Sequence, residues 1–201
     1  MEAYWLYEDV MIENITEETR DHLVDLYFRF IHDKPHTLFH PTLLRKRIRE
    51  DEVGIALLYC IMALAARFSD HAEIRQMTKS LYLAAKHLTK QQIEVVCLDN
   101  IHACILVGNL CGAEGEIEAE AIFFGVAFRM ADICGFPDAH DLEDSVTKEV
   151  IVRTWCSLYM IDQWSSAGLN LRRQIGDEEK RPMDEKRFWR LKPGEFLTPS
   201  I

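Results

Sequence analysis

The sequence predicts an all-α protein in which antiparallel helix pairs are stacked around one core, with no sheet. Apolar residues recur at helical spacing along most of the chain, and no segment alternates apolar and polar residues as a half-buried strand does. Glycine and proline stop several of these periodic segments. Hydrophobic residues make up 48% of the 201 residues, which is enough for one domain with a sizeable core.

The N-terminal part of the domain is predicted to contain three helices. The first begins at Thr16, an N-cap followed by two acidic residues, and ends near Asp33 because Pro35 cannot continue it. A short helix is expected to follow Pro41. Residues 53–68 are apolar nearly all round, so they should form the most buried helix.

Two helices are predicted in the middle of the chain. Asp70 and Glu73 have the spacing of a capping box and should open a helix that carries apolar residues on one face as far as residue 88. The next helix is expected to run from about Gln91 to Cys111 and to be stopped by Gly112.

Two longer helices complete the predicted domain. One runs from about Glu116 to Cys134, and the Gly-Phe-Pro sequence at residues 135–137 is a strong C-terminal signal. The other spans roughly residues 145–167 and ends at Gly168. Short loops between successive helices favour antiparallel neighbours.

The helical domain is expected to occupy residues 16–191, with a short helix over 184–191. Residues 1–15 contain apolar side chains without a clear period, and this N-terminal segment either docks on the body or stays loose. Residues 192–201 hold two prolines and a glycine and are expected to form a poorly ordered tail.

The charge balance argues against nucleic acid and membrane as direct partners. Asp and Glu number 33 against 23 Lys and Arg, which gives a formal charge of -10, and no long basic run is present to grip phosphates. The longest nearly apolar run, residues 55–66, falls short of the roughly 20 residues that cross a bilayer. The start of the chain lacks the basic region of a secretory signal, so we expect an intracellular protein.

No metal centre and no cofactor are expected. The six cysteines contain no C-x-x-C pair, and each lies in an apolar helical pattern that predicts buried, reduced side chains. His32, His36 and His40 are spaced by four, but Pro35 and Pro41 interrupt any helix that would align them. We expect His40 to order the turn before Pro41 instead.

No catalytic constellation is present in the sequence. The glutamates at 114, 116, 118 and 120 are interpreted as solvent-facing partners of a helix N-terminus. Asp162 is more informative, because it continues the apolar stripe of Trp155 and Leu158 and so needs a partner if it is buried. A structural ion pair is the preferred interpretation, and a ligand-contacting acid is the alternative. The candidate partners for the ion pair are Arg129, Arg172 and Arg173.

An ordered series of segments resembles the fungal-specific transcription factor domain. LVDLYFRFIHDKPHTLFHPTLL, residues 23–44, is similar to the opening of that family, with a Tyr-Phe pair on the first helix and a turn that ends in His-Pro. LLYCIMALAARFSD is similar to its buried second helix, and PMDEKRFWRL resembles a later segment. The resemblance runs in order from about residue 16 to residue 191.

Two further segments match signature positions of the family. IEVVCLDNIHACILVGNLCGAEGEIEAEAIFFGVAFRMADICGFPD resembles its central helix pair, with an Ala-x-Arg-x-Ala pattern at residues 127–131 and a closing Gly135. KEVIVRTWCSLYMIDQWSS resembles its signature helix. The matching residues of that helix are Glu149, Arg153, Trp155 and Asp162. The chain departs from the pattern at Val152, Cys156 and Gln163, which stand in place of Arg, Trp and Arg.

The resemblance implies a nuclear regulatory domain that modulates transcription of metabolic or secondary-metabolite genes, in some members by sensing a small molecule. It supplies no catalytic residues, and no cysteine precedes Cys60 to form the zinc cluster of such factors. The implied partners are the rest of a transcription factor or another regulator, a small-molecule effector, and a second copy of the chain. The candidate ligand-binding residues are His40, Arg129, Trp155 and Asp162.

Two other functions stay open at this point. The first alternative is a small enzyme of the cyclase or isomerase type that reuses the helical body. The second is a scaffold that dimerises through exposed helix faces. A closed apolar cavity that holds Asp162 or a histidine would favour an enzyme or a sensor. A packed core without such a cavity, or a large exposed apolar patch, would favour a scaffold.

Overall fold

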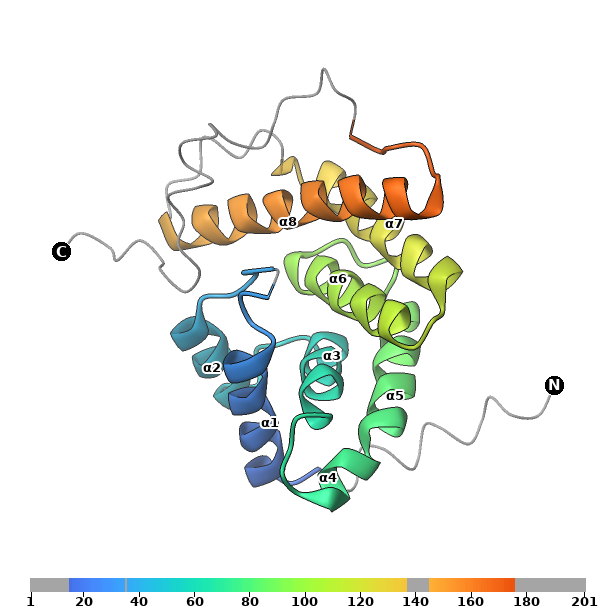
Figure 1. Ribbon diagram of the computed structural model, residues 1–201. Helices are drawn as coiled ribbons and strands as arrows, with labels where there is room; N and C mark the ends of the chain where they lie inside the picture. The colour runs from blue at the N-terminus through green and yellow to red at the C-terminus, as the bar shows by residue number, and fades with distance from the viewer. Residues whose placement is uncertain (1–14, 35, 137–144, 176–201) are drawn as a thin grey trace.

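The computed structural model describes residues 15–34, 36–136 and 145–175 (Figure 1). The described residues form helices and connecting turns without any strand, which confirms the predicted all-α class. The predicted helix at 184–191 and the tail at 192–201 lie outside the described residues, as do residues 1–14. The helices are α1 (Glu17–Phe30), α2 (Pro41–Arg49), α3 (Ile55–Ala66), α4 (Ala72–Gln76), α5 (Thr78–Gln91), α6 (Leu98–Ala113), α7 (Ile117–Ile133) and α8 (Ser145–Leu169).

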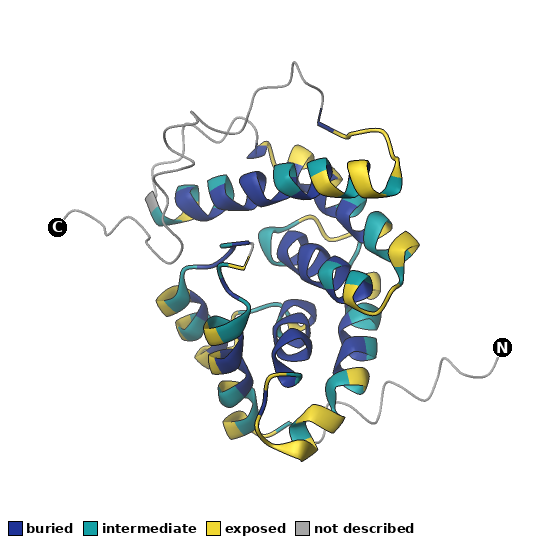
Figure 2. Cartoon of the chain, viewed as in Figure 1, coloured by how far each residue is buried: buried dark blue, intermediate teal, exposed yellow. Residues whose placement is uncertain are grey.

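Helix α3 forms the centre of the core. Every residue of α3 except Ile55 and Leu58 is buried, and the helix packs against α1, α5 and α6 (Figure 2). Its composition explains this position, because an apolar surface all round is stable only when neighbours cover every side. This agrees with the prediction that residues 53–68 hold the most buried helix. Helix α6 is also largely buried.

Local signals at the N-terminal helices act as predicted. The Thr16 hydroxyl accepts a hydrogen bond from the Thr19 N–H at 3.2 Å and caps α1. Helix α1 ends at Phe30, and Asp33 then adopts a left-handed conformation with φ of 67° that turns the chain back. Helix α2 begins at Pro41, where the missing N–H costs nothing.

The predicted capping box at Asp70 is wrong. His71 is the N-cap of α4, and it makes no side-chain cap hydrogen bond. The hydroxyl of Ser69 accepts the His71 N–H at 3.2 Å instead, and so orders the turn before the helix. The helix is also interrupted at Met77, so that α4 and α5 are separate elements where the apolar stripe predicted one.

Helix α6 begins seven residues later than the sequence predicted, because a side chain competes for the backbone before it. The buried Asn100 donates to the Gln92 carbonyl at 3.1 Å and to the Val95 carbonyl at 2.7 Å, which holds residues 92–95 in a turn. Gly112 lies inside α6 rather than after it. The left-handed residue after the helix is Gly115, with φ of 77°.

The last two helices end near the predicted positions. Gly135 takes the left-handed position after α7 with φ of 69°, and Phe136 is buried against the body, as its place in the Gly-Phe-Pro signal predicts. Helix α8 lies along one end of the body, where it packs against α7 (Figure 1). It extends through Gly168, and Asn170 adopts the left-handed conformation that stops it.

Most cysteines are buried free thiols, but the prediction that all of them are buried is wrong. Cys134 is exposed and Cys97 is partly exposed at the start of α6, while the other four are buried. Within the described residues, no three His, Cys, Asp or Glu side chains come together in a group that could hold a metal ion. None of the described helices is long and apolar enough to cross a membrane.

Candidate functional site

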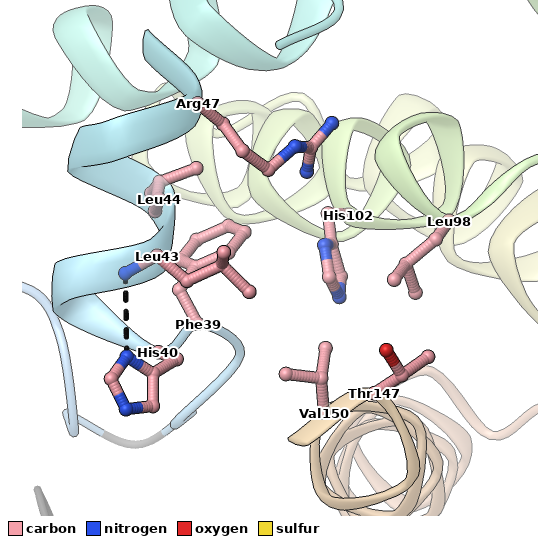
Figure 3. A pocket seen from close by; sticks show the side chains of 9 residues that line it. All are labelled: Phe39, His40, Leu43, Leu44, Arg47, Leu98, His102, Thr147 and Val150. Carbon is pink, nitrogen blue, oxygen red and sulfur yellow. Dashed lines mark hydrogen bonds between the residues drawn. The ribbon is translucent and has the colours of Figure 1, made fainter. Parts of the chain in front are cut away.

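A pocket of about 220 Å³ lies between α2, α6 and α8 (Figure 3). Its walls are largely apolar, and polar groups reach it from α2, α6 and the first turn of α8. The lining residues are Phe39, His40, Leu43, Leu44, Arg47, Leu98, His102, Thr147 and Val150. Three segments far apart in the sequence therefore build one concave surface.

His40 and Pro41 position the α2 side of the pocket. The Nδ1 atom of His40 accepts the Leu43 N–H at 3.3 Å, drawn as the dashed line in Figure 3, and so caps α2. The cap fixes the first turn of the helix, which carries Leu43 and Leu44 toward the pocket. The prediction that His40 orders this turn is confirmed.

Arg47 and Asp99 join α2 to α6 above the pocket. The guanidinium donates from Nη1 to Oδ1 of Asp99 at 3.0 Å and from Nη2 to Oδ2 at 2.8 Å, a two-point contact that fixes both side chains. The Gly54 N–H donates to Oδ2 at 2.9 Å, which also ties the start of α3 to the pair. Burial acts to raise the pKa of Asp99, but the hydrogen bonds from Arg47 and the Gly54 N–H outweigh it and hold the pKa below its usual value.

His102 supplies the most unusual polar group of the pocket. Its imidazole is buried, extends from α6 toward Val150 on α8, and contacts the Phe39 ring edge-on at a centroid distance of 4.8 Å (Figure 3). Burial lowers the pKa of His102 from 6.5 to about 4, so the ring is neutral at neutral pH. A neutral imidazole has one donor nitrogen and one acceptor nitrogen.

The neighbour of His102 identifies which nitrogen is the acceptor. The Thr154 hydroxyl donates to the Val150 carbonyl at 2.8 Å, so its only hydrogen is already used. His102 Nε2 lies 2.8 Å from that hydroxyl oxygen and must therefore be the donor. Nδ1 is then the acceptor nitrogen of the ring.

This geometry suits binding better than catalysis. The walls offer apolar surface, and His102 offers one acceptor inside it. The residues that line the pocket include no carboxylate, thiol or serine, and the second imidazole of the lining, His40, is engaged in capping α2. The guanidinium of Arg47 is engaged by Asp99 and by the Glu52 carbonyl at 2.8 Å.

The four candidate residues from the sequence do not come together in this pocket. His40 lines it. Arg129 is exposed on α7 and lies 3.5 Å from the Asp132 carboxylate. Trp155 is buried in α8, and its indole nitrogen has no hydrogen-bond acceptor among the described residues.

The preferred interpretation of Asp162 as half of an ion pair with arginine is wrong. Asp162 is buried, and its carboxylate accepts the Gln174 N–H at 2.9 Å and the Ile175 N–H at 3.1 Å. These two hydrogen bonds fold the chain that follows α8 back onto the helix, and Ile175 becomes buried as a result. A carboxylate that accepts two backbone N–H groups no longer needs a cationic partner.

The other signature residues of α8 have packing roles. Arg153 Nε donates to Glu149 Oε1 at 2.7 Å, one helical turn away, and both side chains are buried. Glu149, Arg153, Trp155 and Asp162 thus all lie on the buried side of α8.

The structure places two ionisable residues in the pocket that were not among the candidates from the sequence, Arg47 and His102. The available signal for His102 was a polar residue at the centre of an apolar helix, which is uncommon without a function or a partner. No local signal pairs Arg47 with Asp99, because 52 residues separate them.

These observations define an all-helical domain with a small, mostly apolar pocket between α2, α6 and α8. The chain matches the family "Fungal specific transcription factor domain" over residues 24–180, which is more than half of its length. It belongs to this family and is a fungal transcription factor regulatory domain. Comparisons with curated proteins and with solved structures found no match.

Proposed function

We propose that this regulatory domain senses a small effector in the pocket between α2, α6 and α8. The single observation that carries the proposal is the acceptor Nδ1 of neutral, buried His102 inside apolar walls. A hydroxyl or N–H donor on an effector can hydrogen-bond this acceptor nitrogen while the rest of the molecule packs on the apolar walls. The effector class is therefore a compact apolar molecule with one hydroxyl or N–H donor, such as a phenol or a small alcohol.

The pocket offers a physical route from binding to regulation. Its walls come from α2, α6 and α8, and α8 packs mainly on α7. An effector that contacts Val150 on α8 and Leu43 on α2 favours the conformation in which these helices are held together. The change in α8 then alters the surface that the domain presents to its partner.

The proposed cellular role follows the family. The domain modulates transcription of metabolic or secondary-metabolite genes in the nucleus, in contact with the rest of a transcription factor or with another regulator. The formal charge of -10 supports an indirect role in which DNA contact belongs to a separate domain.

A fusion reporter tests the proposal. The chain is joined to a heterologous DNA-binding domain, and transcription from its operator is compared with that of the DNA-binding domain alone. Thr147→Phe fills the mouth of the pocket from an exposed position, and Thr42→Phe is the matched control on an exposed α2 residue outside the lining. We expect the fusion to change transcription, Thr147→Phe to shift that level, and Thr42→Phe to leave it unchanged. Equal transcription from the fusion and from the DNA-binding domain alone would contradict the proposal.

The second candidate function, an interaction scaffold, is favoured by one surface of α7. Ile122 and Ile133 are 62% and 64% exposed, and they lie on one face of α7 with Val126 and Arg129. A second copy of the chain is a suitable partner for this face. The enzyme alternative has no comparable observation in its favour, because the lining of the pocket holds no carboxylate, thiol or serine, and its second imidazole, His40, caps α2.

A further inference from the structure

A second pocket, of about 300 Å³, lies between α6, α7, α8 and the turn before α2. It shares no lining residue with the pocket of Figure 3. It contains a carboxylate, an imidazole and an amide around an apolar floor, with an indole beside them. The lining residues are His36, Asn109, Glu120, Phe124, Ile161, Trp164, Ser165, Gly168 and Leu169.

Two glycines of α6 allow α7 to place its side chains in this pocket. A Cβ added at Gly112 would lie 2.8 Å from Oε1 of Glu120 and 2.9 Å from its Cδ. A Cβ added at Gly108 would lie 2.7 Å from Cδ1 of Phe124. The carboxylate and the ring therefore rest directly on the backbone of α6, and the glycines fix where the two side chains lie.

Glu120 has no cationic partner among the described residues. Within the described residues, no hydrogen-bond donor and no Lys, Arg or His lies within ion-pair distance of its carboxylate. The neighbouring Glu114 and Glu116 differ in this respect, because they pair with Lys79 and Lys86. Burial raises the pKa of Glu120, which means that the charged form has lost hydration that nothing in the pocket replaces.

His36 presents a second unpaired group. Its side chain is buried, with 7% exposure, and its buried Nδ1 atom has no hydrogen-bond partner in the part of the chain that the structure describes. Burial lowers the pKa of His36 to about 4, so the ring is neutral and adds no positive charge to oppose a cation. An unpaired buried nitrogen costs free energy that a ligand hydrogen bond would recover.

Trp164 provides a surface for the apolar part of a ligand. Its indole is 57% exposed although it borders the pocket, and its ring centroid lies 6.4 Å from that of His36. Electron-rich indole faces attract ammonium groups, and they also stack on flat apolar bodies. Phe124 and Ile161 supply apolar contacts deeper in the pocket.

We propose that this second pocket binds a small organic amine, whose ammonium group pairs with the Glu120 carboxylate and whose apolar body packs between Trp164 and Phe124. The geometry selects a cation rather than an anion, because the only ionised side chain in the described lining is Glu120, an acid without a cationic partner among the described residues. This site is separate from the effector pocket beside α2, so either proposal can be wrong while the other holds.

Binding of 2-phenylethylammonium to the 201-residue chain tests the site. Dissociation constants are measured by calorimetry near neutral pH at about 150 mM salt, where long-range attraction to the acidic chain is screened. The neutral and anionic analogues are 3-phenylpropanamide and 3-phenylpropanoate. We expect the ammonium compound to bind about tenfold more tightly than the amide, and the carboxylate compound to bind more weakly still.

Two variants locate the binding. Glu120→Gln keeps the shape of the side chain and should weaken binding of the ammonium compound about tenfold, to the level of the amide. Glu118→Gln is the matched control, because Glu118 is an exposed acid of the same helix outside the pocket. Trp164→Ala should weaken binding of the ammonium and the amide compounds together. Equal losses for Glu120→Gln and Glu118→Gln, or equal affinity for all three compounds, would overturn the proposal.

Discussion

The ring of Phe124 lies against the Cα atom of Gly108, in the space where any other residue would place its Cβ. A Cβ built at position 108 would lie 2.7 Å from Cδ1 of the ring and closer still to Cε1. Four residues further along α6, Gly112 meets Glu120 in the same way. The contact between α6 and α7 is therefore closer than side chains on both helices would allow.

Gly108→Ala should destabilise the protein by about 1–3 kcal/mol, because the added methyl group forces the Phe124 ring or the α7 backbone to move. Urea unfolding measures the change. Gly168→Ala is the control, since a Cβ there meets nothing within 4 Å and alanine favours a helix. It should leave stability unchanged or raise it by up to about 1 kcal/mol. Equal effects of the two changes would contradict the close contact at Gly108.

Asp99→Asn should destabilise the protein by about 1–3 kcal/mol at neutral pH, because it removes the charged acceptor of Arg47 and leaves a partly buried guanidinium poorly paired. The folded-state pKa of Asp99 is lowered, so this stabilisation is complete above the ordinary value of 3.8 and is lost as pH falls below it. The difference in the free energy of unfolding between wild type and Asp99→Asn, measured with urea, should therefore become smaller in acid. A difference that stays constant down to the lowest pH at which the protein is folded would count against the ion pair.

Two buried histidines should make the protein less stable as pH falls. The pKa values of His36 and His102 are lowered from 6.5 to about 4, so between these values the unfolded chain binds protons that the folded chain does not. Each histidine then reduces the free energy of unfolding by up to about 1.4 kcal/mol per pH unit below 6.5. The loss ends near pH 4, where the folded state also takes up the protons.

Glutamine variants separate these two contributions. Unfolding of wild type, His102→Gln and His36→Gln is measured between neutral pH and about pH 5. Each substitution should reduce the dependence of stability on pH by about 2 kcal/mol across this range, whatever its effect at neutral pH. A variant with the same pH dependence as wild type would show that its histidine takes up protons equally in the folded and unfolded states, so that its pKa is not lowered by folding.

The exposed face of α7 should mediate self-association. Ile122→Glu combined with Ile133→Glu places charge on that face, and it should shift a dimer measured by light scattering to monomer. Ala113→Glu adds the same charge at an exposed position at the end of α6 and should leave the association unchanged. If the wild-type chain is monomeric at every concentration tested, the proposed scaffold function is contradicted.

Local signals in the sequence were enough to predict much of the fold. Thr16 caps α1, Pro41 starts α2 and Gly135 ends α7 because each of these residues acts on its immediate neighbours. The start of α6 was mispredicted because the Asn100 side chain takes over the carbonyls of the preceding turn, a competition that apolar periodicity does not register.

The sites were less predictable than the fold because they depend on contacts between distant segments. His40 was selected, but its neighbours in the pocket come from residues 98–102 and 147–150. Asp162 was singled out as an acid on an apolar stripe, yet its partners are backbone N–H groups of residues 174 and 175, which no side-chain pattern reveals. Glu120 looked like an ordinary acid at a helix N-terminus, and only its contact with Gly112 sets it apart.

The pocket beside α2 is proposed to bind an apolar molecule through the acceptor nitrogen of His102. The decisive experiment is a titration of the chain with phenol, followed by methyl NMR, with anisole as the matched compound without a donor. We expect saturable shifts at the methyl groups of Leu43, Leu98 and Val150, with anisole binding at least several-fold more weakly. Shifts elsewhere in the chain, or equal affinity for phenol and anisole, would contradict it.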